Sequence, residues 1–455
     1  MKKFVFVLAL LCSSVLSIWA APQATGEIIP FDANPKAGFH WGYVLYIPQN
    51  LDTSKPLPIL FVMNDNGYYD TQEENIKSVL ERFESSSGDW VEWGIADGVG
   101  VPMVMPMVLR EKGSPTLHTQ DLNRAVFVLK DGPYVRLDLQ VLAMLKDARK
   151  QLKKRNIRTE KKFLVAGFSA AGAFGNKLAF LHPKKIFAAA IGGEVYPTLP
   201  FETYDEVSLI FPVGMYDVKT YTGKRFNKKA WEQIPFLIVN GGDDYNDPLP
   251  YHDVFGEEES VIILGVLGEG TTIDRWNKAR KILEKAAPNV QTHTYPHIDH
   301  DWEKQDVIDF LKAHKYGGPL KPITPTDTSH RPSVLPIKVT KLYWGYQAKE
   351  VVTPKEEQYL GTQEVNMRVE KEIPFWAGYK NSCGFDVLYK GNVVLEDMKC
   401  RGLFTYPKRK IWLQTIRFSD EDVAVLKKTG GKTFNLRSRY PKIWDVSEDL
   451  TFTIK

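Results

Sequence analysis

Apolar residues follow two alternating patterns along the chain as far as residue 315. Short apolar runs of strand length lie at 39–49, 57–63, 101–109, 163–166, 186–193, 235–242 and 290–296. Segments with helical spacing of apolar residues lie between them, at 74–83, 141–152, immediately after 169, 275–285 and 306–314. Apolar strands that alternate with helices predict a parallel sheet covered on both faces. We therefore expect an α/β domain with a mostly parallel, doubly wound sheet.

The pattern changes after His314. Residues 317–336 are rich in proline and lack a period, which predicts an extended linker. Short alternating runs beyond it, such as 385–389, 411–418 and 450–455, predict an all-β, sandwich-like module. The expected organisation is an α/β domain at 22–316, a linker at 317–336 and a β-rich accessory domain at 337–455.

The first 21 residues have the layout of a secretory signal. Lys2 and Lys3 precede the apolar run 4–11, and Ala20 and Ala21 supply small residues for cleavage. This predicts a signal peptide at 1–21 and a secreted or periplasmic protein; the alternative is an uncleaved anchor. No other stretch has the roughly 20 apolar residues of a membrane span, so we expect no transmembrane segment after cleavage.

The net charge bears on possible nucleic-acid partners, and the cysteine content bears on the compartment of the protein. The chain has 59 basic and 55 acidic residues, and cleavage would remove Lys2 and Lys3. The mature chain would then be nearly neutral, so its net charge gives no argument for a nucleic-acid partner. Cys383 and Cys400 are the two cysteines outside the leader. A hairpin at 385–395 brings them onto nearby strands, which predicts a disulfide in an exported chain; the alternative is two free thiols.

Candidate catalytic side chains follow three successive buried strands. Ser169 follows 163–166 with small residues two positions away on either side, as a nucleophile on a strand-to-helix turn requires; it is alternatively a helix N-cap. Acidic residues at 243, 244 and 247 follow the strand 235–242, and His297 and His300 follow the strand 290–296. The carboxyl ends of parallel strands meet at one edge of a sheet, so these groups are expected to lie together.

The segments GFSAAG, LIVNGGDDYNDPLPYHD and YPHIDHDW resemble the α/β-hydrolase superfamily. Within it the chain is most similar to secreted bacterial esterases of the polyhydroxybutyrate depolymerase and feruloyl esterase kind, over roughly residues 36–315. The resemblance implies Ser169 as nucleophile, Asp244 as orienting acid and His300 as base, with no metal or organic cofactor.

The resemblance also implies an oxyanion hole, in which the backbone N–H of Ala170 is one donor and that of Asn66 the other. This chain departs from the family pattern at two places. Many relatives have a His-Gly pair after the strand at 57–63, where this chain has residues 64–67, NDNG. Ala171 stands where glycine is usual.

Other assignments of the same residues stay open. Asp243 or Asp247 is an alternative acid, and His297 an alternative base. Residues 297–300 also match the second half of the zinc pattern H-x-H-x-D-H, but Tyr295 occupies the position of its first histidine. The sequence contains no phosphate-binding loop of the form G-x-x-x-x-G-K-[ST].

The predicted function is that of an exported serine hydrolase that cleaves small or polymeric carboxylic esters. A peptidase or amidase of the same fold and a non-catalytic surface binding protein are the alternatives. The accessory domain offers aromatic residues that form either a platform for polysaccharide or polymer binding or part of a core: Tyr343, Trp344, Tyr346, Trp376, Tyr379 and Trp412.

Overall fold

The computed structural model describes residues 26–65, 67–84, 92–110, 116–249, 252, 254–333, 335–344, 363–370, 383–406 and 411–454. The predicted signal peptide, 1–21, and Asn66 lie outside these residues. Within the described ranges, no helix is long and apolar enough to cross a membrane.

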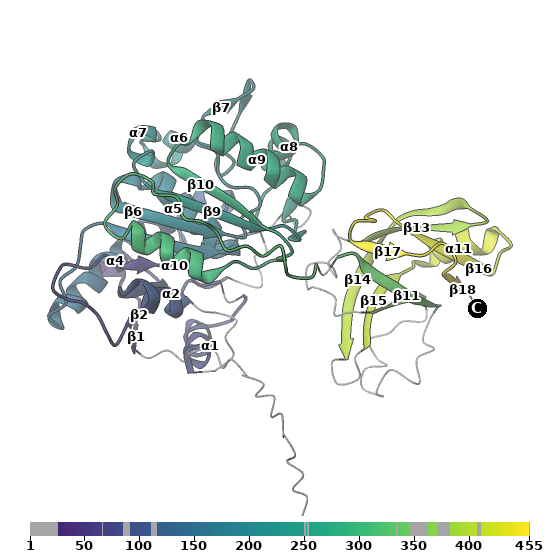
Figure 1. Ribbon diagram of the computed structural model, residues 1–455, viewed down its shortest axis with the longest axis horizontal. Helices are drawn as coiled ribbons and strands as arrows, with labels where there is room; N and C mark the ends of the chain where they lie inside the picture. Colours follow the sequence, from purple (N-terminus) through teal and green to yellow (C-terminus); the bar gives the residue numbers. More distant parts are fainter. Residues whose placement is uncertain are drawn as a thin grey trace, which may run out of the picture.

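The α/β domain is built on a mostly parallel sheet (Figure 1). In the described part of the chain its strands lie in the order β1 (Glu27–Phe31), β2 (Tyr43–Ile47), β4 (Met103–Pro106), β3 (Leu60–Phe61), β5 (Phe163–Phe168), β6 (Ile186–Gly192), β9 (Phe236–Gly241) and β10 (Val290–Tyr295). The pairs β1–β2 and β2–β4 are antiparallel, and every later pair is parallel. This order and these directions are those of the α/β-hydrolase fold, so the predicted fold class is confirmed.

Helices cover both faces of this sheet because its strands are apolar on both sides. Neighbouring residues such as Leu164 and Val165 of β5 belong to separate buried clusters, one on each face. One face packs against α4 (Leu137–Lys154), α5 (Ser169–Leu181), α8 (Glu257–Leu267) and α9 (Thr272–Ala286). The other packs against α1 (Gln72–Glu84), α2 (Glu92–Val99) and α10 (Lys304–Ala313), with α2 and α10 in contact (Figure 1).

Every strand and helix predicted up to residue 315 is present, with ends shifted by a few residues. The sequence patterns did not predict β1, α2 and α8. The sequence of α2 contains two glycines, and the apolar residues of α8 are distributed around the whole helix. Neither segment therefore shows a clear amphipathic period. Short elements lie in the connections: η1 (Pro35–Ala37), α3 (Arg124–Phe127), η2 (Pro183–Lys185), β7 (Thr203–Tyr204), β8 (Val207–Ser208), α6 (Val218–Thr222) and α7 (Lys228–Trp231).

The proline-rich segment makes hydrogen bonds to the α/β domain. Thr326 donates through its backbone N–H and its hydroxyl to the two carboxylate oxygens of Asp306, at 2.8 and 2.7 Å. The Thr328 hydroxyl donates to the Pro296 carbonyl at 2.6 Å, and the Ser333 hydroxyl donates to the Asp243 carboxylate at 2.7 Å. Much of this segment therefore lies against β10 and α10.

The C-terminal β domain is a curled sheet around its own apolar core. Among the described residues its strands lie in the order β17 (Trp444–Val446), β11 (Ile337–Trp344), β12 (Glu364–Val369), β15 (Ile411–Arg417), β14 (Asn392–Tyr406), β13 (Gly384–Tyr389), β16 (Thr433–Ser438) and β18 (Thr451–Thr453). The long strand β14 pairs with β13 along its first half and with β15 along its second, with a register shift between Cys400 and Gly402. Contacts between β11 and β18 bring the ends of the sheet together, which gives the predicted sandwich-like form.

Two of the candidate aromatic residues contribute to this core. Trp344 is buried and stacks on Phe452, and the partly buried Trp412 packs against the same cluster. Tyr346, Trp376 and Tyr379 lie outside the described residues. The helix α11 (Asp420–Lys428), which the sequence patterns did not predict, begins with a capping box between Ser419 and Asp422 and contacts β14.

The predicted hairpin and disulfide are both present. The strands β13 and β14 are joined at Lys390 and Gly391, whose φ angles of 50° and 80° are those of a tight hairpin turn with positive φ at both positions. Cys383 and Cys400 are buried and form a disulfide, with their Cα atoms 5.4 Å apart.

Removal of this disulfide is predicted to destabilise the β domain. The bond closes a loop between residues 17 positions apart, and the lost restriction of the unfolded chain corresponds to about 3 kcal/mol. The double variant C383A/C400A should lose this amount in guanidinium unfolding followed by tryptophan fluorescence. Reductant should lower the stability of the wild type by the same amount as the double substitution and should leave the double variant unchanged. Equal stabilities of the wild type and the double variant without reductant would contradict the prediction.

Candidate active site

Ser169 occupies a strained turn between β5 and α5. Its φ is 55°, in the left-handed region that a residue with a side chain rarely adopts. The helix cap is Phe168 rather than Ser169, so the N-cap interpretation of the serine is wrong. Strain at a serine between a strand and a helix is the geometry of a nucleophile elbow, which directs the hydroxyl away from the backbone.

Glycines make this turn possible. A β-carbon at position 167 would lie 2.4 Å from the carbonyl oxygen of Ala171, and one at position 172 would lie 2.8 Å from the carbonyl oxygens of Gly167 and Gly192. Both contacts are shorter than real β-carbons make, so larger residues at 167 and 172 are excluded. Ala171, in the place where glycine is usual, is buried.

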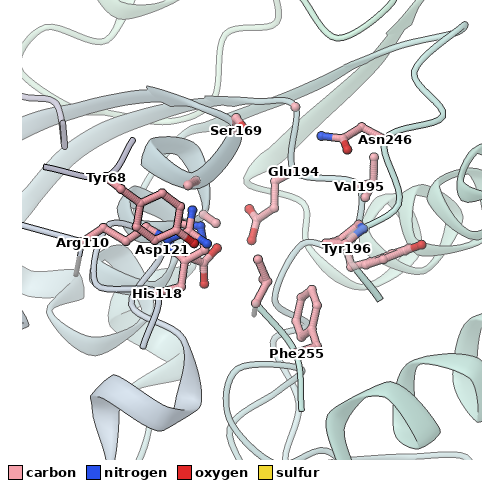
Figure 2. Close-up of a pocket in the computed structure, with 15 residues that line it drawn as sticks. Tyr68, Arg110, His118, Asp121, Ser169, Glu194, Val195, Tyr196, Asn246 and Phe255 are labelled. Atoms are coloured by element: carbon pink, nitrogen blue, oxygen red, sulfur yellow. The ribbon is translucent and has the colours of Figure 1, made fainter. Parts of the chain in front are cut away.

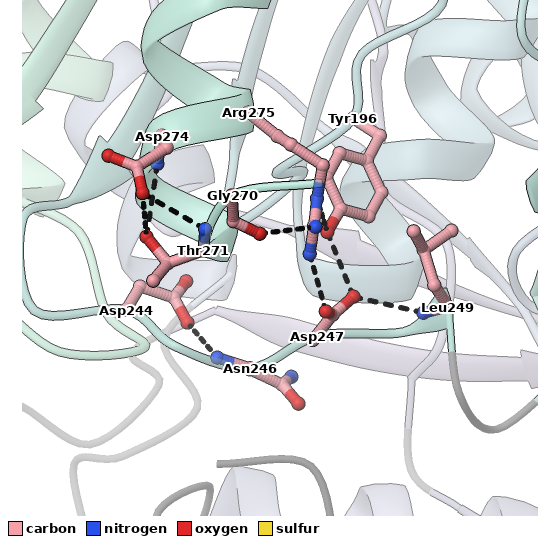
Figure 3. Close-up of polar contacts among 9 residues, drawn as sticks. All are labelled: Tyr196, Asp244, Asn246, Asp247, Leu249, Gly270, Thr271, Asp274 and Arg275. Carbon is pink, nitrogen blue, oxygen red and sulfur yellow. Dashed lines mark hydrogen bonds and ion pairs between the residues drawn. The ribbon is translucent and has the colours of Figure 1, made fainter. Parts of the chain in front are cut away.

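The structure pairs His300 with one of the three candidate aspartates. The Nδ1 atom of His300 lies 2.8 Å from Oδ2 of Asp244, whose side chain is fully buried. The other Asp244 oxygen, Oδ1, accepts a hydrogen bond from the backbone N–H of Asn246 at 3.1 Å (Figure 3). Asp243 instead accepts from Ser333, and Asp247 binds Arg275.

The His300 ring lies close to the turn that carries the serine. It packs edge-on against the ring of Phe168, the residue before Ser169, with centroids 4.8 Å apart. Trp302 packs on the same phenylalanine, at 5.4 Å. Within the described residues the Ser169 hydroxyl makes no hydrogen bond to His300. Catalytic hydrogen bonds often reach full strength only when substrate is bound.

The surroundings of His300 raise its pKa above the ordinary value of 6.5. Burial is the largest effect and acts in the opposite direction, because it disfavours the charged ring. The charge of the Asp244 carboxylate and its hydrogen bond outweigh it, and Asp65 and Asp299 add to the increase. The imidazolium is therefore stabilised where a proton from a nucleophile would be received.

Asp65 is a site residue that the sequence patterns did not single out. Its buried carboxyl group lies close enough to the backbone N–H of Ala170, the predicted oxyanion donor, for this N–H to lower the pKa of the carboxyl group slightly. Burial is the main effect on the Asp65 pKa and raises it, while the charges of His300 and Arg110 act against this increase. One feature of the sequence indicates this residue: Asp65 lies in the segment where many hydrolases of this fold have a His-Gly pair and this chain does not.

A cavity of about 410 Å³ opens beside Ser169 (Figure 2). Ala170 and Ala173 of α5, together with Val195 and Tyr196, form part of its lining. Polar and charged groups form another part of its wall: Arg110, His118, Asp121, Glu194 and Asn246. Tyr68 lies at the edge with the Arg110 guanidinium 4.4 Å from its ring centre.

Three ionisable groups in this wall are buried: Asp121, Glu194 and His118. Asp121 forms an ion pair with Lys177, and both side chains are almost completely buried. Glu194 is 6% exposed, and its Oε2 accepts from Nδ2 of Asn176 at 2.7 Å. Burial raises the Glu194 pKa to about 8 against the opposing effect of Lys177. Burial also holds the His118 pKa well below its usual value, so this ring is neutral.

A network behind the cavity holds the loop that follows β9 (Figure 3). Arg275 of α9 forms an ion pair with Asp247 at 2.5 Å and donates to the Tyr196 hydroxyl at 2.8 Å. The Tyr196 hydroxyl in turn donates to Asp247 at 2.8 Å. Asp247 therefore anchors the loop that contains Asp244 and supports the cavity wall.

The described part of the chain contains no group of three or more His, Cys, Asp or Glu side chains arranged to hold a metal ion.

Comparison with known proteins gave structural matches only. No protein-family model and no curated protein sequence matches the chain. The matching solved structures include poly(aspartic acid) hydrolase-1 from Sphingomonas sp. KT-1, with 15% identity, a TM-score of 0.42, and coverage of 65% of this chain and 100% of that one. A poly(3-hydroxybutyrate) depolymerase from Bordetella parapertussis matches with 16% identity, a TM-score of 0.40, and coverage of 64% and 89%.

A ferulic acid esterase matches with 14% identity, a TM-score of 0.36, and coverage of 64% of this chain and 97% of that one. By their names these three neighbours are a hydrolase, a depolymerase and an esterase. Because the TM-scores lie below 0.5, the fold assignment rests on strand order and direction rather than on these neighbours.

Replacement of Asp244 by Asn is predicted to lower the pKa of His300, because the largest effect that raises it is removed. A histidine titration followed by NMR measures this directly. Asp243→Asn is the matched control, since Asp243 contacts Ser333 rather than His300. An unchanged His300 pKa in Asp244→Asn, or an equal fall in the control, would contradict the prediction.

Proposed function

We propose that this protein is an exported serine hydrolase that cleaves carboxylic esters through an acyl-enzyme formed on Ser169. The observation that carries the proposal is the serine's strained position beside a cavity, next to the ring of a histidine held by a buried aspartate. In this proposal Ser169 is the nucleophile, His300 the general base and Asp244 the acid that orients it.

The contact between His300 Nδ1 and Asp244 determines the proton positions. Nδ1 carries a proton that it donates to the carboxylate, which leaves Nε2 free to accept the proton of the Ser169 hydroxyl. The serine Oγ then attacks the ester carbonyl carbon, and the Nε2 proton passes to the departing alkoxide. Water attacks the acyl-enzyme by the same route in reverse, which releases the acid and restores the serine.

The developing oxyanion needs backbone donors. The proposed donors are the N–H groups of Ala170 and Asn66. The Asp65 carboxyl group lies near the Ala170 N–H, so the substrate oxygen would bind beside it during turnover. An ionised Asp65 next to this donor would oppose a second negative charge, which would favour the alternative of a non-catalytic binding protein on the same scaffold.

The remainder of the chain fits an exported enzyme with an accessory module. The proposed mature protein begins after residue 21 and comprises the hydrolase domain to residue 316 and the β domain from residue 337. Binding of a polysaccharide or other polymer is proposed for the β domain. The buried positions of Trp344 and part of Trp412 leave less aromatic surface for this role than the sequence alone suggests.

Ser169→Ala is predicted to reduce turnover of short p-nitrophenyl esters at least a thousandfold, because the nucleophile is lost. A fluorophosphonate probe should label Ser169 in the folded wild type and leave the variant unlabelled. Ser329→Ala, at an exposed serine in the proline-rich segment, is the matched control and should keep full activity. Absence of both labelling and turnover in the folded wild type would favour the binding-protein alternative, and preference for p-nitroanilides would favour an amidase.

The pH profile is predicted to report His300. The base acts only when neutral, and its pKa is raised, so kcat/KM should fall as the pH decreases through a value above 6.5. In Asp244→Asn the residual activity should show this fall at lower pH, while Asp243→Asn should keep the wild-type profile. A fall at the same pH in wild type and Asp244→Asn would contradict the assignment.

A further inference from the structure

The cavity beside Ser169 contains one carboxyl group without a cationic partner of its own. Lys177, the nearest buried ammonium, donates to both the carboxylate and the backbone carbonyl of Asp121. Glu194 is instead held by a neutral amide, Nδ2 of Asn176. A carboxyl group buried without a paired cation is expected to carry a proton.

The contact with Asn176 fixes where that proton lies. Because Nδ2 donates to Oε2, this oxygen acts as an acceptor, and the proton of the neutral acid is on Oε1. Glu194 lines the cavity and extends into it between Ser169 and Phe255 (Figure 2). The wall of the cavity that Ser169 also lines therefore presents an O–H donor.

A purely hydrocarbon group would fill this cavity poorly. It would leave the Glu194 donor without an acceptor, and an unpaired buried polar group reduces binding. The charges around the donor come from Lys177 and Asp121, which balance each other, and from Arg110 at the wall. The Asp121 carboxylate, which is paired with Lys177, does not act as an isolated negative charge toward an electron-rich oxygen on the substrate.

We infer that Glu194 is a specificity-determining residue that selects esters with a hydrogen-bond-accepting oxygen, such as an ether or carbonyl, in the group that occupies the cavity. This inference rests on the proposed function and adds a substrate class to it.

The test uses pairs of esters that differ by one CH₂ replaced with oxygen. p-Nitrophenyl methoxyacetate and p-nitrophenyl butyrate vary the acyl group, and 2-methoxyethyl acetate and butyl acetate vary the alcohol. The readout is the ratio of kcat/KM for the oxygen-containing ester to that for its hydrocarbon partner. Differences in intrinsic reactivity cancel when the same ratio is compared between protein variants.

Glu194→Met removes the donor at similar size and should lower this ratio about threefold to tenfold in one of the two pairs. Glu194→Gln is the matched control: its carbonyl accepts from Asn176 and its amide N–H₂ faces the cavity, so the ratio should stay near that of the wild type. Equal ratios in wild type and Glu194→Met for both pairs would overturn the inference.

A second arm needs no variant. The Glu194 pKa is about 8, so between pH 6.5 and 9.5 the group changes from donor to carboxylate, and the wild-type ratio in the same pair should fall. The other groups around it do not reverse this expectation: His118 stays neutral, the Asp121 carboxylate is ion-paired with Lys177, and titration of His300 affects both esters of a pair equally. A ratio that is constant or rises with pH would overturn the inference. Turnover of all four esters with unchanged ratios leaves the proposed function standing, whereas no turnover of any ester overturns both.

Discussion

The close packing of the turn between β5 and α5 determines where the candidate active site lies. The strand end and the helix start approach so closely that only glycine fits at positions 167 and 172, and Ser169 between them has a positive φ. The same packing brings the end of β6 against this turn, because Gly192 has room only for its hydrogen beside Phe168 and Trp302. Phe168 in turn supports the ring of His300. The strained serine, the histidine and the loops at the strand ends are thus held by one compact contact.

Buried charge around this contact is balanced in small groups. Asp244 is paired with His300, Asp121 with Lys177, and Asp247 with Arg275. Each pair joins segments far apart along the chain, so the loss of one partner would leave an isolated charge in a region from which water is largely excluded. Glu194 differs from these three acids, because its partner is the neutral amide of Asn176 and burial raises its pKa to about 8.

The β domain has an apolar core of its own, against which Tyr245 of the α/β domain packs. The disulfide between Cys383 and Cys400 joins the residue before β13 to β14, at the point where β14 changes its pairing partner from β13 to β15. A core of this size uses part of the aromatic content that the sequence offered for ligand binding.

The sequence by itself determined the architecture, the order of serine, acid and histidine, and the hairpin with its cysteine pair. These features depend on local periodicity, on small residues beside Ser169, and on turn residues such as Lys390 and Gly391. All of them can be recognised from short segments of the sequence. Only the tertiary structure decided that Asp244 rather than Asp243 or Asp247 contacts His300, because the three lie within five residues and differ only in direction. The polar cavity wall also could not be predicted from the sequence. Asp121, Lys177 and Glu194 come from separate segments, and no local sequence pattern indicates which buried groups will be in contact.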